Sequence, residues 1–270
     1  ALGDADTTID GNGIETAAST GTTIADNSIQ NAGGNGISAS DSAVTVANNS
    51  IDTVAGHGIL LNLVVDAAVA DNWVNNTGGD GVNVTATGKV TVESNTIGVN
   101  GDAGGTVIDG MGVRVVISGS APGNSVVVRG NTIGGDVSST GRIGDDGINV
   151  LGTGTISSVE IADNVIEHTN FNSAGDAGIR VANAQSLVVS GNSVSDVGSY
   201  GIVVLSSTAI TVANNVLDGN EDNGRGTLDG ILVGGGGHAS VSDNTVGDFA
   251  GNGILVGPVL SMSISGNVVD

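Results

Sequence analysis

Apolar and polar positions alternate along this chain in short runs that recur every 22 or 23 residues. Each repeat contains an asparagine with apolar residues three and five positions before it and two positions after it. Around Asn49, for example, these are Val46, Val44 and Ile51. A period of two is typical of strands with one buried face. The asparagine recurs at Asn27, Asn49, Asn72, Asn95, Asn131, Asn164, Asn192, Asn215, Asn244 and Asn267.

A second mark of the repeat is a glycine followed by isoleucine or valine. Apolar residues stand one and three positions after it, as Ile59 and Leu61 do after Gly58. Three short strands therefore fit into each repeat, which predicts one coil of a solenoid. Stacked coils pair in parallel, about 4.8 Å apart. The glycine recurs at Gly13, Gly36, Gly58, Gly81, Gly112, Gly147, Gly178, Gly201, Gly230 and Gly253, which predicts about ten coils.

Both marks have a physical explanation in such a coil. We predict that the ten asparagines stack as a ladder, because an asparagine amide can bond the neighbouring coil. We also expect the ladder asparagine itself to adopt the left-handed backbone conformation that this residue tolerates. The glycine is expected at a turn where no Cβ fits.

These marks resemble the parallel β-helix repeat family of pectate-lyase-like proteins, and their character is similar to repeats of large bacterial surface proteins. They cover nearly the whole chain. The resemblance implies an all-β, right-handed parallel β-helix of about ten coils, forming a single domain over residues 1–270. It does not imply one activity, because this fold carries lyases, hydrolases, epimerases, adhesins and spacers.

Four coils are longer than the others between the asparagine and the next glycine. These intervals are 17, 16, 14 and 15 residues after Asn95, Asn131, Asn164 and Asn215, against nine in the other coils. The four insertion loops are therefore expected on one edge of the rod, and such loops often carry function.

Two insertions resemble calcium-binding loops. Oxygen-bearing side chains at positions 1, 3, 5 and 12 of the segment 218–229 follow the spacing of an EF-hand loop. The candidate calcium ligands are Asp218, Asn220, Asp222 and Asp229, with a weaker set at Asn100, Asp102 and Asp109. The alternative is that Asp, Asn and Gly are simply the residues of surface turns.

Composition narrows the possible partners. The formal net charge is −22, with 28 acidic and 6 basic residues, which argues against nucleic acid because phosphate binding needs clustered Lys and Arg. The chain has no cysteine, and no apolar run approaches the ~20 residues of a membrane span. The acidic, lysine-poor composition favours an extracellular or cell-surface location.

Candidate catalytic motifs match those of known enzymes only in part. Gly56-His57-Gly58 and Asp145-Asp146 resemble motifs of polygalacturonases, but their order is reversed and the NTD and RIK motifs are missing. His57 is therefore interpreted as a chance occupant of a turn, while the two aspartates could be a paired acid and base. Arg114, Asn149 and Arg180 follow marked glycines and form a possible glycan column for an anionic sugar.

The sequence favours a structural function over an enzymatic one. Val203, Leu232 and Leu255 occupy one outward position in consecutive coils and are a possible lateral contact. No cap is evident at either end, so we expect an extracellular solenoid, a surface filament or adhesin stalk, that stacks head to tail on copies of itself. The alternative is a polysaccharide-active enzyme or a glycan-binding β-helix. A carboxylate–arginine groove would have favoured that alternative, and none is evident from the sequence.

Overall fold

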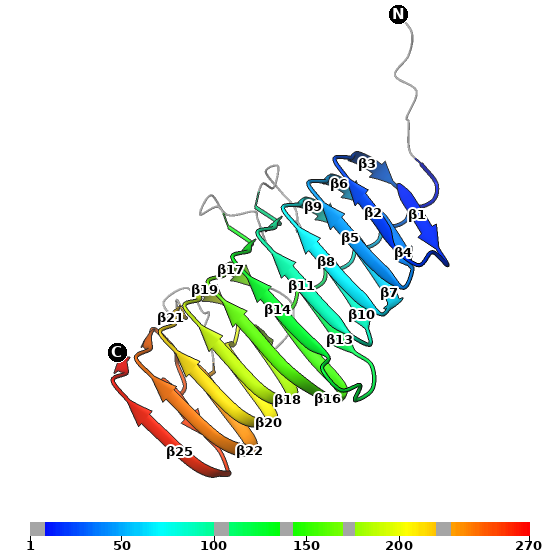
Figure 1. The fold of residues 1–270 in the computed structure, drawn as a ribbon. Helices are drawn as coiled ribbons and strands as arrows, with labels where there is room; N and C mark the ends of the chain where they lie inside the picture. The colour runs from blue at the N-terminus through cyan, green and yellow to red at the C-terminus, as the bar shows by residue number, and fades with distance from the viewer. Residues whose placement is uncertain (1–8, 100–107, 136–142, 170–175, 220–227) are drawn as a thin grey trace, which may run out of the picture.

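The computed structural model describes residues 9–99, 108–135, 143–169, 176–219 and 228–270. The described elements are all strands, stacked as coils along one axis, with β1 at one end of the stack and β25 at the other (Figure 1). Every pairing between named strands is parallel, which is the geometry predicted for a solenoid. Within the described ranges we find no helix of the length and apolarity needed to cross a membrane.

One sheet of ten strands is built from the segments that follow the ladder asparagines, and strands of consecutive coils are neighbours. Its members are β3 (Ser28–Ala32), β6 (Ser50–Val54), β9 (Trp73–Thr77), β12 (Thr96–Ile97), β15 (Thr132–Ile133), β17 (Val165–Thr169), β19 (Ser193–Val197), β21 (Val216–Asp218), β23 (Thr245–Gly247) and β26 (Val268–Val269).

A second sheet holds the strands after the marked glycines and the strands before the ladder asparagines. In the first five coils these are separate strands. The former are β1 (Ile14–Ala17), β4 (Ile37–Ser40), β7 (Ile59–Val64), β10 (Val82–Ala86) and β13 (Val113–Ile117), and the latter are β2 (Thr22–Ala25), β5 (Ala43–Ala47), β8 (Asp66–Ala70), β11 (Lys89–Glu93) and β14 (Ser125–Arg129). The next four coils merge both into β16 (Ile148–Ala162), β18 (Ala177–Ser190), β20 (Tyr200–Ala213) and β22 (Ile231–Ser242), and the last coil has β24 (Ile254–Val256) and β25 (Val259–Ser265).

The core consists of the positions that the alternation predicts. Val46 and Ile51, on either side of Asn49, are fully buried, as are Ile59 and Leu61 after Gly58. The same inward positions stack in register from coil to coil. Side chains of Val, Ile, Leu and Ala thus fill the interior, which needs no large rings.

The asparagine ladder is confirmed. In each of the nine steps from Asn27 to Asn267, the backbone N–H and the side-chain Nδ2 of one asparagine donate to Oδ1 of the next, at 2.9–3.0 Å. Nδ2 of each also donates to backbone carbonyl groups, as Asn72 does to Val46 O and Ala70 O. The ladder therefore satisfies the polar groups of a buried turn.

The left-handed conformation is one residue away from where we expected it. The prediction that the ladder asparagine itself adopts it is wrong, because the residue immediately before it has a φ of 55–69° in all ten coils. The ladder side chain can then point inward from an ordinary backbone. These preceding positions hold residues that tolerate positive φ, namely Asp26, Asn48, Asp71, Ser94, Gly130, Asp163, Gly191, Asn214, Asp243 and Gly266.

The marked glycines are required by close packing. A Cβ at Gly58 would lie 2.6 Å from the carbonyl oxygen of Gly81 in the next coil and would collide with the side chain of Val74. The other marked glycines have the same surroundings, except that a Cβ at Gly253 in the last coil would meet only the side chain of Val269, and none has a positive φ. The expectation that no Cβ fits there is confirmed.

Candidate acid–base site

A second, interrupted ladder runs along the residues that immediately precede the marked glycines. Oδ1 of Asn12 accepts from Asn35 N at 2.8 Å, and Oδ1 of Asn35 accepts from His57 N at 2.8 Å. Nδ1 of His57 then accepts from Asp80 N at 2.9 Å, and Oδ1 of Asp80 accepts from Met111 N at 2.8 Å. His57 is therefore a turn residue, as interpreted, and the structure adds that its ring nitrogen caps the backbone of the next coil.

Asp146 occupies the same ladder position and collects four hydrogen bonds. Its Oδ1 accepts from Ala177 N at 2.6 Å and from Nη2 of Arg180 at 3.3 Å. Its Oδ2 accepts from Nε of Arg180 at 2.9 Å and from Nδ2 of Asn149 at 2.6 Å. The Asp146 side chain is 3% exposed, so this is a buried, charge-assisted pair with a satisfied carboxylate.

Asp145 and Asp176 stand two residues before the marked glycines of consecutive coils. In coils one to five and in coil ten this position is a glycine, at Gly11, Gly34, Gly56, Gly79, Gly110 and Gly251. Two carboxyl groups thus stand at equivalent places, one coil apart, beside the buried Asp146. We call Asp80, Asp145, Asp146 and Asp176 the aspartate cluster.

Burial and mutual repulsion perturb two members of this cluster. Burial, together with the charges of Asp146 and Asp145, raises the pKa of Asp176 to about 6, while Arg180 opposes this increase. Burial also raises the pKa of Asp145, and the charges of Asp146 and Asp80 add to it. Oδ2 of Asp176 is buried and has no hydrogen-bond partner within the described part of the chain. The cluster therefore holds a carboxyl group that is protonated in mildly acidic solution beside others that carry charge.

The predicted glycan column exists as a row of neighbours. Arg114 pairs in register with Asn149, and Asn149 with Arg180. The donors of Asn149 and Arg180 are directed to Asp146, however, whereas Arg114 has no ion pair with another described residue. Whether the row binds a sugar stays a prediction, and it now depends on Arg114.

The predicted lateral contact continues this row. Arg180 is followed in register by Val203, Leu232 and Leu255. Their exposure increases toward the last coil, from 1% at Val203 to 40% at Leu255. The three residues therefore stack as predicted, but Val203 is buried at its outward position rather than exposed.

The calcium sites also stay predictions. Asn220 and Asp222 lie outside the described residues, as do Asn100 and Asp102. Asp218 and Asp109 are exposed, and Oδ1 of Asp229 accepts from the backbone N and Nδ2 of Asn252, both at 2.8 Å. In the described ranges no three His, Asp or Glu side chains are grouped so that they could hold a metal ion.

Sequence reasoning identified Asp145 and Asp146 as a possible pair but missed Asp176. An alignment of the repeats on their marked glycines contains the missing signal, because the position two residues before the glycine changes from Gly to Asp in coils six and seven alone. Where a repeat departs from its pattern, the packing of the coil does not explain the new residue. Such a residue is a candidate for a functional role.

Comparison with known proteins gives a match to one family. A family model described as a right-handed β-helix region matches residues 6–121 and 115–270. No curated protein and no solved structure matches the chain.

Proposed function

The chain belongs to the right-handed β-helix family, and we propose that it acts on a polysaccharide by acid–base hydrolysis of a glycosidic bond. The observation that carries this proposal is the pair of stacked carboxyl groups, Asp145 and Asp176, beside the Asp146–Arg180 ion pair. The fold leaves function open, so the proposal depends on this site rather than on the family.

Glycoside hydrolysis uses two carboxyl groups: one gives a proton to the leaving oxygen, and the other either activates a water molecule, at a separation of roughly 6.5–9.5 Å, or attacks the sugar itself, at roughly 5–5.5 Å. Asp176 suits the first task, because its pKa of about 6 keeps it protonated in mildly acidic solution. We assign it to protonate the leaving oxygen. Asp145 stands at the equivalent place one coil earlier, about 4.8 Å along the stack, so we assign it to attack the sugar as the leaving group departs; water then hydrolyses the covalent intermediate and releases Asp145. Asp146 and Arg180 are positioning residues, since each satisfies the other and holds the charge beside Asp176.

Arg114 is the described group best placed to bind an acidic substituent of the glycan. It stands between Asn83 and Asn149 in the outward row, and it is partly exposed. Asn83 donates to Asp80 at 2.6 Å, as Asn149 does to Asp146, so Arg114 lies between two amides that are already engaged. A guanidinium that makes no ion pair with any described residue is suited to a uronate or sulfate group.

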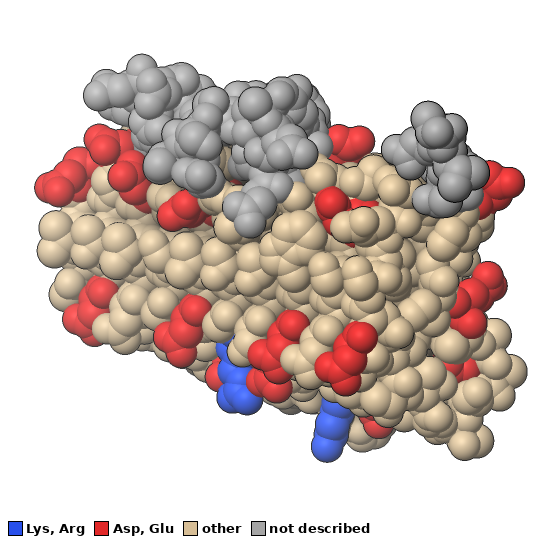
Figure 2. Space-filling model, turned by 90° about the horizontal axis from the view of Figure 1, so that it is seen from above, with Lys and Arg blue, Asp and Glu red and all other residues tan. Residues whose placement is uncertain are grey.

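The negative net charge of the protein is expected to weaken its binding of an acidic polymer. A protein of charge −22 repels an anionic polymer at long range, and Asp and Glu side chains are spread along the length of the face seen in Figure 2. Salt screens this repulsion over about 8 Å at physiological ionic strength but leaves the contact at Arg114 largely intact. The KM for an acidic polymer is therefore expected to decrease when moderate salt is added.

Measurement of new reducing ends on a panel of acidic and neutral polysaccharides tests the proposal. We expect an acidic polymer to be cleaved, with kcat/KM decreasing above about pH 6 as Asp176 loses its proton. Arg114→Ala should raise the KM for the acidic polymer at least fivefold with little change in kcat. Absence of new reducing ends on every polymer, or unsaturated products that indicate elimination, would contradict the proposal.

A second candidate function is structural, because the tenth coil presents a surface that another coil fits. Leu260, Met262 and Ile264 of β25 are 80%, 60% and 49% exposed. The ladder also has a direction, since every asparagine donates to the next coil. The backbone N–H of Asn267 thus lies at one end of the stack and Oδ1 of Asn27 at the other. A second copy of the chain would continue this pattern with the same polarity.

Electron microscopy of the concentrated protein tests this assembly. We expect rods longer than one copy, and Ile264→Arg should shorten them to single particles because it places a charge in the apolar contact. Leu63→Arg is the matched control, since Leu63 is 70% exposed but lies away from the tenth coil. Single particles of the unaltered chain at high concentration would contradict it. Both candidate functions are ones performed outside the cell or at its surface, where the composition also predicts the chain to act.

A further inference from the structure

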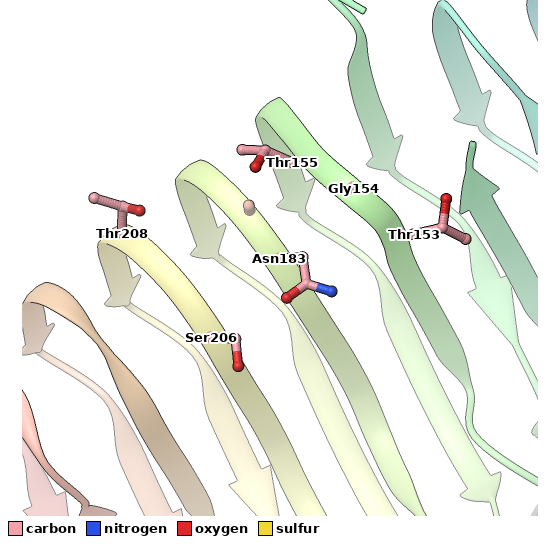
Figure 3. Close-up of a pocket in the computed structure, with 7 residues that line it drawn as sticks. Thr153, Gly154, Thr155, Asn183, Ser206 and Thr208 are labelled. Carbon is pink, nitrogen blue, oxygen red and sulfur yellow. The ribbon is translucent and has the colours of Figure 1, made fainter. Parts of the chain in front are cut away.

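A hollow of about 290 Å³ lies on another part of the surface, where β16, β18 and β20 bend between their two halves (Figure 3). It is lined by Thr153, Gly154, Thr155, Asn183, Ala184, Ser206 and Thr208. None of these residues belongs to the aspartate cluster. Its volume is close to the lower limit of small-molecule sites, which suits a ligand the size of one sugar ring.

A bulge in β16 creates one wall of the hollow. Leu151 pairs with Ala182 and Ile156 pairs with Ala184, so four residues of β16 face one residue of β18, which makes three extra residues. The two following coils bend at the same place, where Asn183 has a φ of 66° and Ser206 a φ of 51°. Asn and Ser tolerate this conformation, which here turns each strand between its two halves.

Hydrogen bonds fix this wall in place. Nδ2 of Asn183 donates to Gly152 O at 2.7 Å, and Thr155 N donates to Oγ of Ser120 at 3.0 Å. Oδ1 of Asn124 accepts from Ser157 N at 2.7 Å. The hollow is thus formed before any ligand arrives, which lowers the entropic cost of binding.

The lining offers neutral hydrogen-bonding groups. Hydroxyl groups of Thr153, Thr155, Ser206 and Thr208 surround it, together with the amide of Asn183, and the lining contains neither a charged nor an aromatic side chain (Figure 3). Thr153 Oγ1 accepts from Gly119 N at 3.2 Å, so its hydroxyl proton is left for donation. Because Nδ2 of Asn183 donates to the wall, its Oδ1 is left to accept a hydrogen bond from a ligand. Hydroxyl and amide groups recognise other hydroxyl groups, whereas a charged ligand would lose hydration without compensation.

We infer that this hollow is a binding site for a neutral sugar unit, separate from the aspartate cluster. The site needs no catalytic group, and its function would be to hold a glycan against the side of the rod. A few neutral hydrogen bonds without an aromatic platform correspond to an affinity in the millimolar range.

Titration of the ¹⁵N-labelled chain with maltose, and separately with glucuronate, tests this inference by NMR. We expect saturable shifts of the amide signals of Thr155, Asn183 and Ser206 with maltose, and at least tenfold weaker binding of glucuronate. Thr208→Leu, which removes a hydroxyl and partly fills the hollow, should weaken maltose binding at least fivefold. Thr45→Leu on the exposed face of β5 should leave it unchanged.

Three results would overturn the inference: no saturable shift with maltose, equal affinity for glucuronate, or unchanged binding by Thr208→Leu. Asp176→Asn separates this site from the proposed hydrolytic one, because it should leave maltose binding at the hollow intact. Loss of maltose binding in that variant would mean that the sugar occupies the aspartate cluster instead, which also overturns the inference.

Discussion

Replacement of Asn192 by leucine is expected to lower the free energy of unfolding by about 4 kcal/mol, since each buried polar group that loses its partner costs roughly 1–3 kcal/mol. Asn192 donates to Ile161 O, Ser190 O and Oδ1 of Asn215 at 2.9–3.1 Å. Its own Oδ1 accepts from the backbone N and Nδ2 of Asn164. Leucine replaces none of these groups. Chemical denaturation followed by circular dichroism measures the change.

Ser193→Leu is the matched control for this substitution. Ser193 is the adjacent residue, is exposed, and lies in register between the exposed Val165 and Val216. The same new side chain should change stability there by no more than about 0.5 kcal/mol. Equal effects of the two substitutions would mean that the ladder contributes nothing beyond ordinary packing.

Replacement of Asp176 by asparagine is expected to lower kcat by a factor of about 10²–10⁴, the usual contribution of a positioned proton donor. The same variant should be more stable than the unaltered chain at pH 7, by about 1 kcal/mol once the partial exposure of the group is taken into account. Loss of activity with gain of stability separates a proton donor from a residue that the fold needs. Asp71→Asn, at an exposed position outside the aspartate cluster, is the control and should change neither quantity.

The pH dependence of this effect follows from the direction of the pKa change. The pKa of Asp176 rises from its ordinary value of 3.8 to about 6 on folding. Between these values the folded chain binds more protons than the unfolded chain, so the contribution of Asp176 to stability falls as pH rises. Above about pH 6 the full penalty is present. The stability gained by Asp176→Asn should therefore disappear near pH 4, and a gain that persists there would contradict this account.

The fold could be predicted from the sequence because the repeat reports the environment of each position ten times. Inward positions such as Val46 and Ile51 stay apolar, and Asn49 cannot change without breaking bonds to two neighbouring coils. The left-handed residue was misplaced by one position because Asn, Asp, Gly and Ser occur both at the ladder turn and in other turns. Residue type alone could not distinguish the ladder side chain from the one before it.

The candidate site could be predicted only in part, because it is made of departures from the repeat. Asp145 and Asp146 are adjacent in the chain and were identified as a pair. Asp176 stands 30 residues later, at the end of an insertion of its own. The insertions differ in length, so its place one coil from Asp145 is evident only when the coils are aligned on Gly147 and Gly178. Composition likewise could not show that Arg180 is directed to Asp146 whereas Arg114 is not.

The titration of Asp176 tests the central claim most directly. The carboxyl carbon signal of Asp176 can be followed by ¹³C NMR as a function of pH and assigned by its loss in Asp176→Asn. An acid–base site in the aspartate cluster predicts an apparent midpoint at about pH 6, because burial and the neighbouring charges of Asp146 and Asp145 favour the protonated form. A midpoint near the ordinary value of 3.8 would contradict it, since Asp176 would then hold no proton to donate at the pH where the other carboxyl groups are charged.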